Sequence, residues 1–430
     1  MREDTTTLNF HLDCKAPITD GLSYHYVSGK HLWIAVNKGS VIVLEDDLQI
    51  IFEQLIRGTI PKDIILEAQD QELRLRNLRK LVRKCAEAGF INGFKGYSTT
   101  QSSDDARRFA RLHVTNRCQL KCIHCYTDAG QKNLESDELS TVEWKAIIKD
   151  LAENGCTSIV FTGGEPLFRT DCIELLKQAH DCKIENIGVM TNGLLVSRYI
   201  DDLAKYLSSI QIGMDGADEV TNDKVRGRGT FRRIIRALDA LSQTHLDVKA
   251  SIALLEMNWP SIRDNLTELS RRYDKNRIKF KIGKGLLDYG RATSLQDSLD
   301  TFPIQPFVGK FNASFYPPAR FHVHHELKIC GIYSQILIAS DGQVYPCHLQ
   351  HRSLGYIKDK TIREWQDFFE KQWHKYTADH VEGCRDCDLR NLCGGSCKVL
   401  DQKRMGSEFV TSCTPDVIEK TYQNLVRIFQ

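Results

Sequence analysis

Three cysteines in the first half of the chain have the spacing of an iron–sulfur ligand set. Cys118, Cys122 and Cys125 form a C-x3-C-x2-C run directly after a strand-like stretch at residues 111–115. A 4Fe–4S cluster normally takes four protein ligands, so three thiolates leave one iron open to another molecule. Structural zinc sites usually pair one C-x2-C with a second such pair or with histidines, which makes zinc the weaker interpretation of this spacing.

A second group of cysteines lies toward the C-terminal end of the sequence. The chain has fifteen cysteines, of which ten fall into these two groups and five are scattered. Grouped cysteines in a chain without an export signal indicate metal ligation rather than disulfides. Zinc bound by the C-x2-C pair is the alternative. The second group comprises Cys330, Cys347, Cys384, Cys387, Cys393, Cys397 and Cys413.

Length and composition set broad limits on the kind of protein. At 430 residues, the chain is long enough for two or three domains with cores of their own. The formal net charge of +2 gives no support for a nucleic-acid partner. The sequence has no apolar stretch of membrane-spanning length and its first residues lack an apolar signal region, so we expect a cytoplasmic protein without a membrane partner.

Strand-like and helix-like segments alternate regularly from residue 108 onward. Such alternation predicts parallel strands joined by crossover helices. Six units are fewer than the eight of a closed barrel, so we expect an α/β partial (β/α)6 barrel that is open on one side. Ligands in such folds gather at the carboxyl ends of the strands. The expected strands are residues 111–115, 158–162, 186–191, 209–214, 248–254 and 277–282.

Residues 20–95 read as a winged-helix module. Short β-rich runs at 23–27, 31–36 and 40–44 are separated by turn residues and followed by helices. We expect the first helix to be capped by Asp47 and the second to begin at Pro61. A third helix, residues 72–88, has an apolar side and a basic side, the latter formed by Arg76, Arg79, Lys80 and Arg83.

The cysteine run and four later segments together resemble the radical S-adenosylmethionine (SAM) enzymes. Thr162–Phe168 (TGGEPLF) is similar to the segment that holds the SAM amino group, and Met190–Gly193 and Gln211–Ala217 resemble later strand-end motifs. Gly290–Ala292 is similar to a late Gly-Arg-Ala element. The ordered match covers residues 108–295, and each motif follows an expected strand.

The resemblance implies a site for SAM at the open iron of the first cluster. Glu165 would accept a hydrogen bond from the SAM ammonium group, and the two glycines before it would let backbone approach the methionine end. The family often has Ser where this chain has Gly213, which removes one expected hydroxyl contact. The implied cofactor-binding residues are Tyr126, Gly163, Gly164, Glu165, Pro166, Asn192 and Asp215.

The C-terminal cysteines resemble the SPASM extension of radical SAM proteins, which carries auxiliary iron–sulfur clusters. The resemblance implies two such clusters. One of them has only three cysteines, so its fourth iron is either open or bound by His324. His348 stands where sulfatase-maturing relatives place an acid–base residue, so it is a candidate general base. Cys330, Cys347 and Cys397 would hold auxiliary cluster I, and Cys384, Cys387, Cys393 and Cys413 would hold auxiliary cluster II.

The N-terminal module resembles the recognition element that binds precursor peptides of ribosomally made natural products. The resemblance implies that a leader peptide docks on residues 20–95 as an added strand beside residues 41–44. Two alternatives remain: the basic helix is only a solvated face, or the module binds DNA.

The sequence therefore predicts a radical SAM/SPASM oxidoreductase that modifies a precursor peptide, most simply by an oxidative thioether, ether or carbon–carbon cross-link. Formylglycine-type oxidation and a non-catalytic, zinc-containing DNA binder are the alternatives. An electron donor such as flavodoxin or ferredoxin is the second expected partner. The expected domains are 1–95 (recognition module), 96–107 (linker), 108–300 (radical SAM partial barrel), 301–327 (bridging segment) and 328–430 (SPASM domain).

Overall fold

The computed structural model describes residues 12–91, 108–130, 138–273, 278–283, 290–295, 331–349, 352–393 and 396–429. The chain divides into two compact units. The module unit comprises Met1–Gln101, Pro317–Cys330 and His374–Gln430, and the barrel unit comprises Ser102–Tyr316 and Gly331–Trp373.

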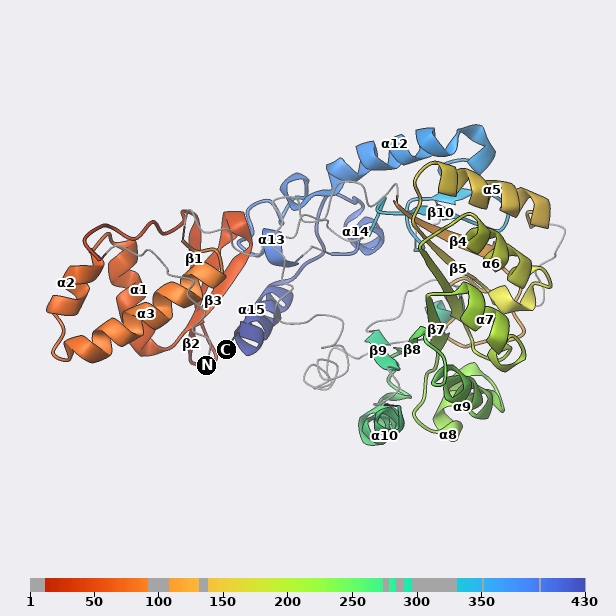
Figure 1. The fold of residues 1–430 in the computed structure, drawn as a ribbon, viewed down its shortest axis with the longest axis horizontal. Helices are drawn as coiled ribbons and strands as arrows, with labels where there is room; N and C mark the ends of the chain where they lie inside the picture. The colour runs from red at the N-terminus through yellow and green to blue at the C-terminus, as the bar shows by residue number, and fades with distance from the viewer. Residues whose placement is uncertain are drawn as a thin grey trace. The chain divides into compact units, whose positions relative to one another are not determined.

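The barrel unit is built on a sheet in which six strands that follow one another in the sequence run parallel (Figure 1). Their neighbours are consecutive in sequence, as successive β–α units require. This confirms the expected six-stranded partial barrel. The strands are β4 (Phe109–Thr115), β5 (Ser158–Gly163), β6 (Asn186–Thr191), β7 (Ser209–Gly213), β8 (Asp247–Ala253) and β9 (Lys279–Gly283).

Helices connect these strands and cover the outer face of the sheet. On β8, Val248, Ala250 and Ile252 are buried, while the residues between them point to the other face. Ser140 and Glu143 form a capping box that starts the first of these helices. The helices are α5 (Thr141–Glu153), α6 (Cys172–Asp181), α7 (Ile200–Tyr206), α8 (Glu219–Arg226), α9 (Thr230–Leu241) and α10 (Trp259–Arg272).

Two short strands from later in the chain extend the sheet beyond β4. β10 (Ile336–Ile338) pairs with β4 in parallel, and β11 (Val344–Tyr345) pairs with β10 in an antiparallel hairpin. α12 (Ile362–Trp373) completes this part of the barrel unit. This extension was not predicted, because strands of two or three residues are too short to show a hydrophobic period.

The module unit contains an antiparallel sheet in the order β1-β2-β3, followed by three helices. The order of strands and helices matches the winged-helix prediction. The first helix starts after Glu45, so the expected cap Asp47 lies inside its first turn instead. The elements are β1 (Leu22–Val27), β2 (Lys30–Ala35), β3 (Ser40–Leu44), α1 (Asp46–Ile56), α2 (Pro61–Leu66) and α3 (Gln71–Glu87).

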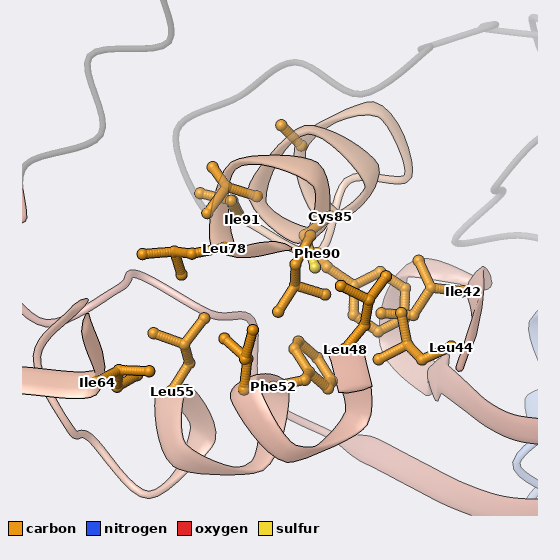
Figure 2. Close-up of a cluster of buried hydrophobic side chains, with 14 of the residues drawn as sticks. Ile42, Leu44, Leu48, Phe52, Leu55, Ile64, Leu78, Cys85, Phe90 and Ile91 are labelled. Carbon is orange, nitrogen blue, oxygen red and sulfur yellow. The ribbon is translucent and has the colours of Figure 1, made fainter. Parts of the chain in front are cut away.

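One face of this small sheet packs against its own helices. Figure 2 shows Ile42 and Leu44 of β3 among side chains of α1 and α3, with Phe52 and Cys85 at the centre. All four are almost fully buried. The apolar surface buried here gives the module a hydrophobic core of its own.

The opposite face of the sheet is covered by α15 (Pro415–Phe429) from the end of the chain (Figure 1). Val41 and Val43 of β3 pack with Tyr422, Leu425 and Val426 of this helix. The alternation of side chains along β3 therefore serves two cores, and every residue of the strand is buried. The remaining helices of the unit are α13 (Arg390–Cys393) and α14 (Lys398–Met405). Among the described residues, no helix is long and apolar enough to cross a membrane.

Candidate functional site

A cavity of about 300 Å³ opens at the carboxyl ends of strands β5 to β8 in the barrel unit. The three cysteines of the C-x3-C-x2-C run line it together with residues that follow the strands. Of the seven residues expected to bind SAM, five line this cavity, whereas Glu165 and Pro166 are buried and do not. The five are Tyr126, Gly163, Gly164, Asn192 and Asp215.

The cysteine side chains are suited to an iron–sulfur cluster. Cys118 Sγ accepts hydrogen bonds from Leu120 N at 3.4 Å and from Asn192 Nδ2 at 3.7 Å. Burial raises the pKa of Cys118 to about 11 and also raises that of Cys122, so metal binding here must displace thiol protons. In the described part of the chain, no three His, Cys, Asp or Glu side chains converge on one metal ion. A cubane needs no such convergence, because each thiolate binds a different iron.

Arg291 of the Gly-Arg-Ala segment holds the cysteine loop in place. Its Nε donates to Cys122 O at 2.9 Å, its Nη2 donates to Ala129 O at 3.0 Å, and its backbone N–H donates to Cys125 O at 3.0 Å. Gly290 has φ +57°, and a Cβ there would lie 2.5 Å from Cys125 O. The motif thus acts as a clamp on the carbonyls of the loop that carries the thiolates.

The two glycines after β5 allow a close backbone approach to the end of β4. Gly163 has φ +126°, and a Cβ there would lie 2.2 Å from Thr115 O. Gly164 would place a Cβ 2.3 Å from Arg117 O. Gly164 N donates to Thr115 O at 2.7 Å. These glycines therefore have a packing role within the protein in addition to their expected place beside SAM.

The carboxylate of Glu165 is fully buried and ties two strand ends together. It accepts hydrogen bonds from Thr191 Oγ1 at 2.7 Å, Asn192 N at 2.7 Å and Leu167 N at 3.1 Å. Burial raises its pKa to about 7 despite these donors. In this structure Glu165 positions Asn192, which in turn lines the cavity and donates to Cys118.

Asp215 is the centre of a buried charge cluster beside the cysteines. Its carboxylate accepts from Arg226 Nε at 2.6 Å and from Ala253 N at 2.8 Å, and it lies 3.2 Å from His124 Nε2. Its carboxylate is therefore engaged by protein groups. The guanidinium of Arg226 lines the cavity and has donors to offer to an anion there.

Arg226 occupies the space that the small residue at position 213 leaves. A Cβ on Gly213 would lie 2.4 Å from Arg226 Nη2 and 2.7 Å from Nη1. Gly213 thus stands in place of the family's Ser, and the guanidinium of Arg226 lies where a side chain at position 213 would begin. Arg226 and His124 were not among the residues predicted from the sequence, although His124 lies within the cysteine run itself.

His348 lies near Tyr126 within the barrel unit. Their rings are 6.1 Å apart, centroid to centroid, in an edge-to-face arrangement. His348 is reached by solvent, yet surrounding protein lowers its pKa to about 4, with Arg111 and Lys281 adding to the effect. It is therefore a neutral imidazole at pH 7 in the structure.

Five of the C-terminal cysteines line one cavity in the module unit. Four are those expected to hold auxiliary cluster II, and Cys397 of the proposed cluster I set joins them. A fully buried ion pair between Lys398 and Asp401 braces this cavity, and Asp401 also accepts from Ser412 N at 2.8 Å. The four are Cys384, Cys387, Cys393 and Cys413.

Of the other candidate ligands of cluster I, Cys347 is the one that lies among the described residues. Cys347 is buried just after β11 in the barrel unit. Cys330 and His324 lie outside the described residues. This ligand set stays a prediction.

Comparison with known proteins places these observations in a family. Residues 112–268 match the model of the radical SAM superfamily, and residues 330–388 match the SPASM model, described as an iron–sulfur cluster-binding domain. Fe-coproporphyrin III synthase of Methanosarcina barkeri is 37% identical over 354 residues, which cover 71% of this chain and 87% of that protein. PqqA peptide cyclase of Bradyrhizobium diazoefficiens is 24% identical over 310 residues, covering 67% of this chain and 80% of that protein.

A solved structure has the same fold over most of the chain. SuiB of Streptococcus suis, bound to its precursor peptide SuiA, superimposes with a TM-score of 0.56 at 16% identity. The match covers 93% of this chain and 99% of SuiB.

Proposed function

Because this chain belongs to the radical SAM superfamily and carries a SPASM domain, we propose that it modifies a ribosomally made precursor peptide by oxidative cross-linking. The cofactors of this family are a 4Fe–4S cluster that binds SAM and, in the SPASM domain, auxiliary iron–sulfur clusters. When they are bound at the cavity of the barrel unit, the 4Fe–4S cluster and SAM would together supply a 5′-deoxyadenosyl radical.

The residues around the cavity would hold SAM in a fixed orientation. We assign the guanidinium of Arg226 to the SAM carboxylate. The hydrogen bond from Arg226 Nε to Asp215 already fixes the position of that guanidinium. Tyr126 forms part of the cavity wall beside the last cluster cysteine. Abstraction of one hydrogen from the peptide gives 5′-deoxyadenosine, and closure of the link releases a proton and an electron.

The proton and electron need acceptors within the protein. His348 is the proposed base, since its ring is unprotonated and lies next to Tyr126. Its pKa is lowered to about 4, so a proton taken up there would pass on readily to solvent. An auxiliary cluster held by Cys384, Cys387, Cys393 and Cys413 would supply an acceptor for the electron. The balance is loss of two hydrogens per link from the peptide, with SAM converted to methionine and 5′-deoxyadenosine.

The open edge of β3 is the observation that carries the peptide assignment. β3 pairs only with β2 among the described residues, so an added strand could bind its other edge once it displaces the protein groups that bury all five residues of β3. Lys84 of α3 donates to Val43 O at 2.6 Å, which places that carbonyl on the open edge facing α3. Alternate residues of an antiparallel strand direct both backbone groups to the same side, so Val41 and Val43 would bind the leader.

The names of related proteins support two kinds of substrate. PqqA peptide cyclase and the SuiB complex support a peptide. The relative at 37% identity is named for a porphyrin product, so a carboxylate-bearing porphyrin is the second candidate. The open strand edge favours the peptide, because a strand edge recognises backbone and a porphyrin has none.

Co-expression with any short peptide that a neighbouring gene encodes tests the proposal. Mass spectrometry should show loss of about two mass units per link, because each link removes two hydrogens. An unchanged peptide, together with turnover of coproporphyrin-type tetrapyrroles by the anaerobically purified protein, would favour the second candidate and overturn the first.

A further inference from the structure

The inner face of the barrel sheet carries cations that form no ion pair with a carboxylate of the described residues. On β4, Ala110, Leu112 and Val114 are buried against the helices, so Arg111 and His113 point to the inner face. On β9, Phe280 and Ile282 are buried in the same way, so Lys281 also points inward. Four strands of the sheet lie between β4 and β9. The charge of Arg111 nevertheless acts on both His113 and Lys281.

Arg111 lies beside the wall of the SAM cavity. Its Nη1 is 3.4 Å from Met190 Sδ, and its Nε donates to Gln335 Oε1 at 3.3 Å. Met190 lines the cavity, as does Tyr126, whose phenol lies close enough to Arg111 to interact electrostatically. Among the described residues, no carboxylate forms an ion pair with this guanidinium. Burial lowers its pKa, as expected for a cation without a counter-charge.

His113 has a polar atom that nothing in the described structure satisfies. The residue is buried, and its Nε2 has no hydrogen-bond partner. Burial, followed by the nearby charge of Arg111, lowers its pKa to about 3, so the ring is neutral. An unsatisfied ring nitrogen in this position is a cost unless a ligand completes it.

Lys281 differs from the other lysines on the same inner face. Lys249 and Lys279 both pair with Asp247, at 3.1 Å and 2.8 Å. In the described part of the chain, Lys281 pairs with no carboxylate, and its pKa is lowered by burial and then by Lys249 and Arg111. The ion pairs of Lys249 and Lys279 with Asp247 lie toward the start of the strands. Lys281 lies nearer the strand ends, where SAM would bind.

We propose that Arg111, Lys281 and His113 form a carboxylate-binding site for an Asp or Glu side chain in the modified segment of the peptide. The two cations would supply the counter-charges, and His113 Nε2 would add a hydrogen bond. A carboxylate held by Arg111 places the carbons next to it beside Met190 and Tyr126, at the wall of the cavity. The site thus selects which part of the peptide meets the radical. This inference rests on the proposed peptide substrate.

Binding of model tripeptides to the reconstituted holoenzyme tests the site. The probes are Ac-Ala-Glu-Ala-NH2, Ac-Ala-Gln-Ala-NH2 and Ac-Ala-Ala-Ala-OH, and the readout is broadening of their proton NMR lines by the reduced iron–sulfur clusters. We expect the Glu peptide to bind at least about tenfold more tightly than the Gln peptide, because a charge-assisted pair is lost. Equal broadening of these two contradicts the site. Stronger broadening of the free-acid peptide would assign the site to a chain terminus and overturn the side-chain assignment.

Variants locate the effect. Arg111→Gln and Lys281→Gln should each abolish the preference for Glu, and Arg111→Lys should restore part of it. Lys279→Gln on the same strand is the matched control, since its charge is already paired, and it should keep the preference. Iron content and thermal melting of each variant check that the protein is folded. A preference that survives in both Gln variants overturns the proposal.

The natural peptide separates this inference from the proposed function. If co-expression yields no modified peptide, the proposed function fails. If the peptide is modified, and replacing each of its Asp and Glu residues by Asn and Gln leaves the yield unchanged, only the carboxylate site fails. Tight binding of coproporphyrin III with no preference among the tripeptides would assign the cations to a porphyrin instead.

Discussion

The cavity of the barrel unit and the β3 edge of the module unit would recognise their proposed ligands in opposite ways. In the cavity, Asp215 and Glu165 each accept hydrogen bonds from several protein groups, so the side chains around the SAM site are fixed beforehand. At β3, the recognition groups are backbone atoms, and one of them is capped by a single flexible lysine. A cofactor of constant shape suits the first arrangement, and a peptide of variable sequence suits the second.

The largest effect should come from the cluster ligands themselves. Cys122→Ala removes one of three thiolates, so we expect no measurable 5′-deoxyadenosine and a loss of iron. Cys182→Ser is the control, because Cys182 lies at the end of α6 away from the cavity and accepts a hydrogen bond from Gln178. Retained 5′-deoxyadenosine formation in the Cys122 variant would refute the assignment of the cavity.

Asp215→Asn tests how far the cavity depends on its buried charges. The change leaves Arg226 without a counter-charge, which should destabilise the barrel unit by about 4 kcal/mol. Urea unfolding followed by circular dichroism measures this loss. Asp264→Asn, at an exposed ion pair with Arg263, should cost far less. Similar values for the two variants would mean that the cavity is not held by this charge cluster.

Leu425→Ala tests the dependence of the module on the C-terminal helix. Leu425 is buried between α15 and the sheet, so its truncation should destabilise the module unit by about 3 kcal/mol. Leader binding, measured by fluorescence anisotropy with a labelled peptide, should weaken with it. Lys420→Ala, on the exposed side of the same helix, is the control. Unchanged stability would show that the module stands without α15.

Lys84→Met should have the smallest effect, and it should strengthen leader binding rather than weaken it. Without the lysine, the carbonyl of Val43 is free, so an added strand no longer competes with an internal donor. We expect leader binding to strengthen by about fivefold, the equivalent of one ordinary hydrogen bond. Lys80→Met, one turn earlier on α3, controls for the loss of charge. If both variants weaken binding equally, the lysines act through charge and the strand edge is not limiting.

The deletion of residues 1–95 would be a poor test of leader docking. It would expose the apolar side of α15, including Tyr422 and Val426, as well as removing the leader site. A loss of activity would then have two explanations. Point changes at the strand edge avoid this problem, because they leave both cores of the module intact.

The sequence alone predicted the six parallel strands and the residues at their ends. Strands such as 209–214 have strong hydrophobic character, and cysteine spacing depends only on local sequence, so both are visible without a fold. The same holds for the three strands and three helices of the module. Their periods are local properties of the chain.

Only the tertiary structure showed what surrounds those residues. Arg226 fills the space at Gly213, α15 covers β3, and the charge of Arg111 acts on Lys281 of a distant strand. Each of these depends on contacts between residues far apart in sequence. The sequence therefore determined which chemistry the protein carries, because ligand types and spacing are local, and the fold decided which charges are paired and which are left for a substrate.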